Sequence, residues 1–130
     1  MSFFLLPAEL VEAIHDEVLN PGELSGSARD RPLEAALARV EHRLAYGLIG
    51  DVFDLAAAYA VAVARGHCFH DGNKRTAFRC MQVCLDLYGF IEPEGTEAQQ
   101  GDLIIRVASG GMDEGDLADW LRAQTRPADD

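Results

Sequence analysis

The chain has 130 residues, of which 48% are hydrophobic, and a formal net charge of -11. This length suits one domain with a buried core, which we expect to span about residues 7–125 of a single 1–130 unit. The negative charge argues against direct nucleic-acid binding and against anionic lipid surfaces. No apolar run is long enough to cross a bilayer, and the first residues do not resemble a signal peptide, so we expect a cytoplasmic protein.

Two amphipathic helices are predicted in the first third of the chain. The first covers Pro7–Asn20, where a proline suits the helix start and apolar residues recur at spacings of three and four. A surface loop rich in Pro, Gly and Ser follows over Pro21–Asp30. The second helix begins at Pro32 and ends before Gly47.

The third helix is expected to be the central one. Asp51 is a suitable N-cap, the following residues are apolar nearly all round, and Gly66 supplies a C-terminal stop. The fourth helix runs from Asn73 to Gly89, so two buried helices bracket the loop between them.

Two further helices complete an all-α, six-helix bundle. A weaker helix is predicted over Glu97–Val107, after a turn at Pro93–Gly95, and a last one over Asp113–Gln124. The tail from Arg126 is expected to fray.

The three cysteines are interpreted mainly as reduced core thiols. Cys80 and Cys84 lie one helical turn apart inside an apolar pattern. A metal-binding Cys pair is the alternative, although it lacks a second pair of ligands.

The stretch from Gly66 to Ala77 holds most of the chemically capable residues. Within it or at its edge lie four of the eleven Lys and Arg residues, namely Arg65, Lys74, Arg75 and Arg79. Lys74 is the only lysine in the chain. An acidic chain that gathers its cations at one place indicates a small anionic ligand.

The start of the fourth helix is a candidate phosphate site. Gly72 and Asn73 lie where backbone N–H groups lack helical partners and the helix dipole is positive. Gly72 allows close approach to the backbone, and the Asn73 amide can donate to phosphate oxygens. Lys74 and Arg75 bring full charges to the same end.

Three other side chains of the loop have predicted tasks. Asp71 could hold Mg²⁺ together with phosphate oxygens. His67 titrates near neutral pH and could take a proton from an attacking hydroxyl. Phe69 is expected to point inward and anchor the loop.

Plainer interpretations remain open at this point. Gly72-Asn73 could be an ordinary helix start, and His67 an ordinary loop histidine. His70-Asp71 also suggests a metal-dependent phosphohydrolase, which would need further ligands such as Asp51 or Asp86. His15 and His42 are expected on a helix surface or in interhelical hydrogen bonds.

The signature of the Fic/Doc family, His-x-Phe-x-Asp/Glu-Gly/Ala-Asn-Gly/Lys-Arg, resembles the stretch His67-Cys68-Phe69-His70-Asp71-Gly72-Asn73-Lys74-Arg75. Upstream, Ile14-His15-Asp16 and Arg29-Asp30 also resemble the Doc branch. The resemblance covers most of residues 8–90 and implies a compact helical fold whose active site is the motif loop and the N-terminus of the fourth helix.

The resemblance implies an ATP-dependent transferase that modifies a protein hydroxyl. By likeness, His67 is the base, Asp71 positions Mg²⁺, and Phe69 anchors the loop. The phosphates are held by the run Gly72, Asn73, Lys74 and Arg75. Relatives with Gly after the Asn generally transfer AMP, whereas the Doc toxin has Lys there, as this chain does at Lys74.

We therefore expect a Doc-type toxin that phosphorylates a Ser or Thr of a translation factor, elongation factor Tu by family likeness, and arrests translation. The alternatives are AMP transfer and a catalytically silent antitoxin-binding module. Tyr46–Gly50 is assigned to the family's flap, which lays the target beside the base. The intrachain inhibitory motif of some relatives is not found, so a separate Phd-like antitoxin is the expected partner, with its C-terminal segment in a groove of this domain.

Overall fold

The computed structural model describes residues 3, 5–26, 28, 32–91 and 96–128. These residues contain six helices, which confirms the predicted all-α class. They are α1 (Ala8–Val18), α2 (Leu33–Ala45), α3 (Val52–Gly66), α4 (Asn73–Leu87), α5 (Glu97–Ser109) and α6 (Glu114–Gln124). The predicted Arg29-Asp30 pattern and the Pro93–Gly95 turn lie outside the described residues.

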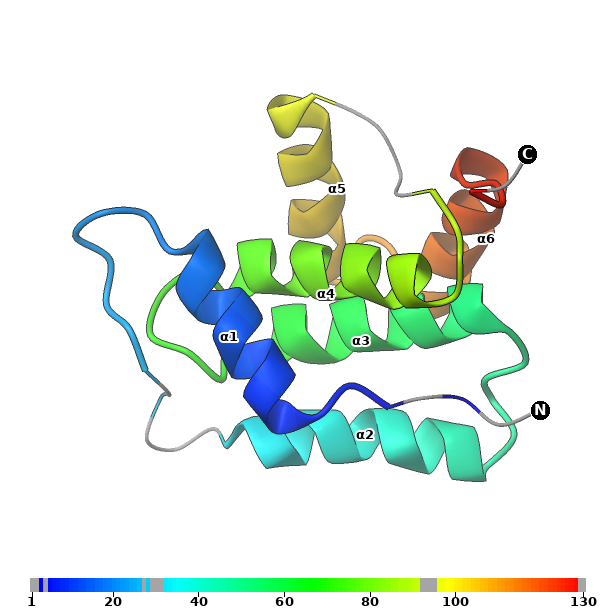
Figure 1. The fold of residues 1–130 in the computed structure, drawn as a ribbon, viewed down its shortest axis with the longest axis horizontal. Helices are drawn as coiled ribbons and strands as arrows, with labels where there is room; N and C mark the ends of the chain where they lie inside the picture. Colours follow the sequence, from blue (N-terminus) through cyan, green and yellow to red (C-terminus); the bar gives the residue numbers. More distant parts are fainter. Residues whose placement is uncertain (1–2, 4, 27, 29–31, 92–95, 129–130) are drawn as a thin grey trace.

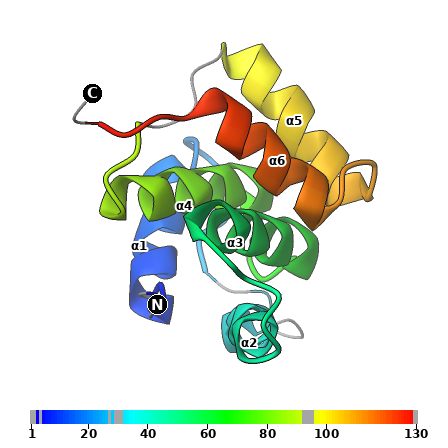
Figure 2. The ribbon, with the colours of Figure 1, turned by 90° about the vertical axis from the view of Figure 1, so that its right-hand side faces the viewer.

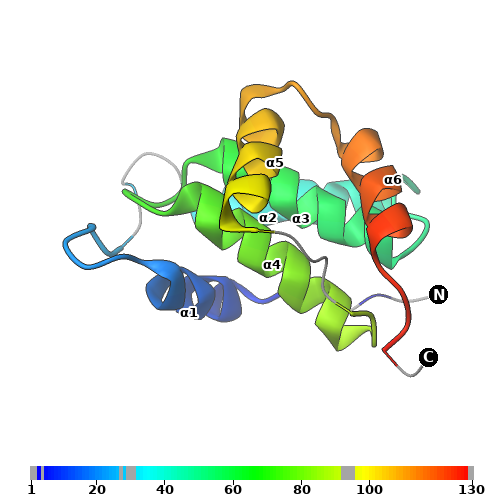
Figure 3. The ribbon, with the colours of Figure 1, turned by 90° about the horizontal axis from the view of Figure 1, so that it is seen from above.

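The helices form three layers (Figures 1 and 2). The antiparallel helices α3 and α4 lie side by side in the middle. On one side, α1 packs on α4 and α2 packs on α3; on the other, α5 contacts both central helices and α6 contacts α3. Figure 3 shows α5 and α6 lying across the central pair. The loop between α3 and α4 is therefore held by the two most enclosed helices.

Helix α3 is central, as predicted, because its residues are small and apolar on every side. Its buried positions include six alanines, which allow neighbouring helices to approach closely. At its start the Asp51 carboxylate accepts a hydrogen bond from the Asp54 N–H at 2.9 Å, which confirms the expected N-cap. Tyr59 is also buried, and its hydroxyl accepts the Leu6 N–H at 2.8 Å, which ties the N-terminal segment to the core.

Helix α5 is longer and better capped than its sequence pattern indicates. Thr96 and Gln99 form a capping box, in which each side chain bonds the other residue's backbone N–H. Gly110, in the left-handed conformation, ends the helix. Since both ends are satisfied, the helix runs two residues beyond the predicted Val107.

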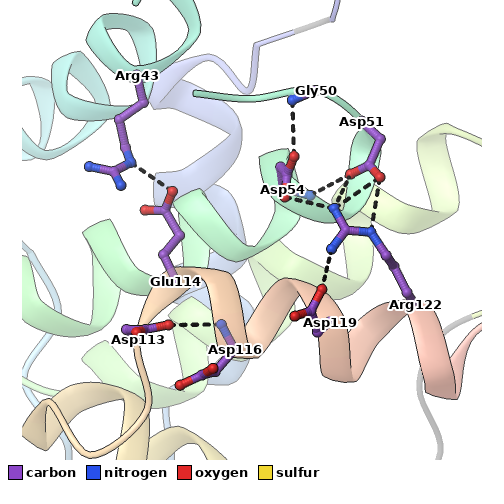
Figure 4. A network of polar contacts seen from close by, with 9 residues as sticks. All are labelled: Arg43, Gly50, Asp51, Asp54, Asp113, Glu114, Asp116, Asp119 and Arg122. Carbon is purple, nitrogen blue, oxygen red and sulfur yellow. Dashed lines mark hydrogen bonds and ion pairs between the residues drawn. The ribbon is translucent and has the colours of Figure 1, made fainter. Parts of the chain in front are cut away.

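Helix α6 is fastened to the rest of the bundle by charged side chains (Figure 4). The Arg122 guanidinium bonds Asp51, Asp54 and Asp119 at 2.6–3.0 Å. Burial alone would lower the pKa of Arg122, but the hydrogen bonds that it donates to Asp54 and Asp51 raise it. The α2–α3 loop is thereby joined to α6 at the end of the bundle away from the motif.

The expectation that the chain frays from Arg126 is wrong for residues 126–128. The Ile91 N–H donates to the Arg126 carbonyl at 2.9 Å, and the Ala128 N–H donates to the Gly89 carbonyl at 2.8 Å. This short pairing satisfies backbone groups beyond the ends of α4 and α6. Across the described residues, the helices are too short or too polar to span a membrane.

Candidate active site

The loop between α3 and α4 carries the predicted motif at one end of the central helix pair (Figure 1). His67 follows the end of α3 in the left-handed conformation, with φ of 51°. This conformation costs a non-glycine residue roughly 1–2 kcal/mol, so packing of the loop must sustain it. The imidazole of His67 is exposed at this turn. It is thus accessible to a substrate hydroxyl, as its predicted role requires.

Phe69 is buried under the loop, so its side chain points inward as expected. Asn73 closes the loop above it with two hydrogen bonds. Its Oδ1 accepts the Phe69 N–H at 3.1 Å, and its Nδ2 donates to the Phe69 carbonyl at 2.9 Å. The side chain of Asn73 therefore braces the loop and uses one of its two amide N–H groups to do so. Its backbone N–H lies in the first turn of α4, where an anion is predicted to bind.

Gly72 has a φ of 79°, which is the left-handed conformation that favours glycine. The turn before α4 is therefore one reason for a glycine here, beside the access to the backbone that an anion needs. A Cβ at this position would lie 3.3 Å from Leu19 Cδ2 and 3.4 Å from Arg75 Nη2. The first backbone bond inside α4 joins the Thr76 N–H to the Gly72 carbonyl at 2.9 Å. The N–H groups at residues 73–75 precede this bond, and they are the donors of the predicted anion site.

Asp71 is held from two sides, by α1 and by the segment that follows α1. Its Oδ2 accepts the Leu24 N–H at 2.8 Å, and its backbone oxygen lies 2.7 Å from His15 Nε2. Among the described residues, Oδ1 has no hydrogen-bond partner. A half-buried carboxylate with one available oxygen suits Mg²⁺ that takes its other ligands from phosphates and water.

Arg75 lies at the same end of α4 but is engaged within the chain. Its Nε donates to the Val18 carbonyl at 3.1 Å, and its Nη2 pairs with the Glu23 carboxylate. The hydrogen bond from Arg75, followed by that from the Asn20 N–H, lowers the pKa of Glu23. Glu23 is therefore a carboxylate bound by one of the cations that we assign to phosphate.

A hollow of about 420 Å³ opens beside these groups between α1, α4 and α5. It is lined by cationic and apolar side chains, including Lys74, Arg75, Arg79, Val18, Phe78 and Ile104. The positive end of the helix dipole and these three cations make this hollow cationic, although the chain as a whole is acidic.

Residues 24–26 and 28 run along the motif loop. The Ala28 N–H donates to the Cys68 carbonyl at 2.7 Å, and the His70 N–H donates to the Gly26 carbonyl at 3.4 Å. The assignment of Tyr46–Gly50 to a flap beside the base is wrong. That loop joins α2 to the start of α3, whereas His67 follows its end, and 15 residues of helix separate them by roughly 22 Å. Residues 24–26 and 28 lie beside the motif loop, where a flap is expected.

The described residues do not supply the metal ligands that the metal-dependent phosphohydrolase alternative requires. Asp51 caps the far end of α3, and Asp86 lies near the C-terminal end of α4. In the part of the chain that the structure describes, no group of three His, Cys, Asp or Glu side chains could hold a metal ion. Cys80 and Cys84 are buried in α4, and burial raises the pKa of both thiols to about 12.

His15 is a residue of the site that sequence reasoning placed elsewhere. It was expected on a helix surface or between helices, but it is buried against the motif loop. Its ring stacks on Phe69 with 3.8 Å between ring centroids and 9° between planes. The available signal was its spacing from Val11 and Ile14, which places it near the apolar face of α1.

The fold and the site together define a class of protein: an all-α domain in which a turn between two buried helices carries a histidine, a carboxylate and a helix N-terminus. The family model described as "Fic/DOC family" matches residues 5–85. Over 120 residues the chain is 39% identical to "Protein kinase doc" of Escherichia phage P1, covering 89% of this chain and 90% of that protein. The chain belongs to the Fic/DOC family, in its Doc branch.

Proposed function

We propose that this protein is a Doc-type kinase that transfers the γ-phosphoryl group of ATP to a Ser or Thr hydroxyl of another protein. The supporting observation is that an exposed imidazole, an available carboxylate oxygen and the cationic N-terminus of α4 lie on one loop–helix junction. Lys74, in place of the glycine of AMP-transferring relatives, favours phosphoryl transfer. The name of the phage P1 relative agrees with a kinase.

In this proposal His67 takes the proton of the substrate hydroxyl. The hydroxyl oxygen forms a bond to the γ-phosphorus, and the bond from that phosphorus to the β–γ bridging oxygen breaks, which releases ADP. Lys74, Arg75 and the first N–H groups of α4 hold the phosphates. Asp71 would hold Mg²⁺, which neutralises negative charge on the phosphates when bound.

The substrate segment is proposed to lie against residues 24–26 and 28. These residues adjoin the motif loop through backbone hydrogen bonds, and the Leu24 side chain is 63% exposed beside Asp71. By family likeness the substrate is elongation factor Tu in the cytoplasm, so that the protein acts as a toxin that arrests translation.

A Phd-like antitoxin is the proposed inhibitory partner. The hollow between α1, α4 and α5 presents cations around apolar side chains, which suits an acidic amphipathic segment. A segment bound there would cover Lys74 and Arg75 and so exclude ATP.

Gly101→Glu tests this binding place. It would add a carboxylate to the lining of the hollow, at a position where a Cβ meets open space. We expect it to weaken antitoxin binding, whereas Ser109→Glu, on α5 outside the hollow, should not.

The function is tested by incubating the protein with Mg²⁺, elongation factor Tu and ATP labelled at either the γ- or the α-phosphate. Transfer of the γ-label supports the kinase, and transfer of the α-label alone would establish AMP transfer. His67→Ala should abolish labelling, and His70→Ala, which changes the neighbouring exposed histidine, should retain it. If neither label is transferred and His67→Ala still arrests growth, the protein is a silent binding module.

A further inference from the structure

We propose that His15 is a positioning residue that sets the Asp71–Gly72 peptide so that both residues face the phosphate site. This inference rests on the proposed function. It concerns nucleotide binding, and it therefore holds for transfer of either phosphate or AMP.

His15 lies in the third turn of α1 and is 1% exposed. Its Nε2 is 2.7 Å from the carbonyl oxygen of Asp71, across 56 positions of sequence. Because a carbonyl oxygen only accepts hydrogen bonds, this contact assigns the proton of the neutral ring to Nε2. The other nitrogen, Nδ1, faces the exposed Asp16 carboxylate at 3.8 Å, beyond direct hydrogen-bond distance.

The same ring supports the loop from below. It stacks on Phe69 at 3.8 Å between centroids, and its Cδ2 would lie 3.7 Å from a Cβ on Gly72. Phe69 is in turn held by both hydrogen bonds of Asn73. One buried side chain therefore contacts the loop at two points, the ring of Phe69 and the carbonyl of Asp71, and lies beside the glycine turn that follows.

The carbonyl contact has a directional consequence for the anion site. The described residues include no cis peptide bonds, and in a trans peptide the C=O and the following N–H point in opposite directions. Holding the Asp71 carbonyl toward the buried His15 thus turns the Gly72 N–H away from α1. That N–H joins those of the first turn of α4 as a donor for phosphate.

Two substitutions separate the hydrogen bond from the stacking. His15→Phe keeps a flat ring on Phe69 but removes the donor, whereas His15→Gln keeps an N–H near the position of Nε2 and removes the ring. The measurement is the dissociation constant for Mg-ATP by calorimetry, together with the thermal midpoint of each variant. Asp16→Asn serves as a control for the exposed carboxylate beside Nδ1.

We expect His15→Phe to weaken Mg-ATP binding about tenfold, the effect of one lost hydrogen bond, with a thermal midpoint close to that of the wild type. His15→Gln should restore most of the affinity even if its midpoint falls, and Asp16→Asn should bind as the wild type does. Wild-type affinity in a folded His15→Phe variant would overturn the proposal. It would also be overturned if the affinities of the two variants fell in the same order as their thermal midpoints, because the loss would then reflect stability alone.

If His15→Phe does not fold, the wild-type protein provides the test by nitrogen NMR of its imidazoles. A proton on Nε2 of His15, with hydrogen-bonded chemical shifts, supports the proposal, and a proton on Nδ1 alone refutes it. Failure of the wild type to bind nucleotide would instead count against the proposed function.

Discussion

The guanidinium of Arg75, in the first turn of α4, forms an ion pair with the carboxylate of Glu23, which lies 52 residues earlier in the chain. The same guanidinium donates to the last carbonyl of α1, that of Val18. The Glu23 carboxylate thus pairs with Arg75, a cation that we assign to the phosphates of ATP. Nucleotide binding and this internal pair should therefore compete.

We predict that Glu23→Gln strengthens Mg-ATP binding by up to about fivefold. An exposed ion pair contributes little net stability, and the loss of the pair appears as affinity because Arg75 no longer has to leave a charged partner. Calorimetric titration at low salt measures the effect. Glu17→Gln changes the net charge equally at an exposed position of α1 and should bind ATP as the wild type does. Equal gains in both variants would show only a general effect of charge.

Asn73 should stabilise the loop through both of its bonds to Phe69. We predict that Asn73→Ala lowers the free energy of unfolding by about 1–3 kcal/mol, because it leaves a backbone N–H and a carbonyl of buried Phe69 without partners. Asn73→Asp keeps the acceptor for the Phe69 N–H and loses the donor, so its loss should be smaller. Urea unfolding gives the free energies, and amide exchange at Phe69 reports the local effect. Unchanged exchange in Asn73→Ala would contradict the bracing role.

The ion pairs of Arg122 should contribute to stability in a way that salt weakens. We predict that Arg122→Gln lowers the free energy of unfolding by about 1–2 kcal/mol, since three partly exposed pairs are lost and three carboxylates then repel each other. Unfolding in 0.05 M and 1 M salt should show a smaller difference at high salt. Arg126→Gln, an exposed arginine beyond α6, is the control for net charge. A loss that is independent of salt would mean that packing dominates.

The buried thiols and phenol predict a loss of stability at alkaline pH. Burial raises the pKa of Cys80 and Cys84 from 9.0 to about 12 and that of Tyr59 from 10.0 to about 12. The contribution of these groups to the free energy of unfolding is fully present below the pKa values of the unfolded chain. It is lost as pH rises from those values toward 12, because only the unfolded state ionises between the two. Urea unfolding between pH 8 and 11 should show the decline.

Cys84→Ala should reduce the slope of that decline, although the cavity lowers stability at every pH. The native thiols at Cys80 and Cys84 should also resist alkylation at pH 8 and react only after unfolding. Rapid native alkylation of either would contradict their burial.

The secondary structure was largely predictable because its signals are local. The Asp51 cap, the stop at Gly66 and the start at Asn73 depend on residues within a few positions of each helix end. The motif is contiguous, so the sequence also identified His67 and Asp71 together. The misplacement of the flap was avoidable, since a continuous α3 already separates Tyr46–Gly50 from His67 by its own length.

What only the tertiary structure decided is how α1 and the segment after it meet the motif loop. The contacts of His15 with Asp71 and of Glu23 with Arg75 join positions more than 50 residues apart, and they depend on how α1 crosses α4. Helix periodicity predicts which face of a helix is buried but not what that face contacts. The sequence by itself therefore determined the helices, the motif and the family, and packing decided which side chains hold the motif in place.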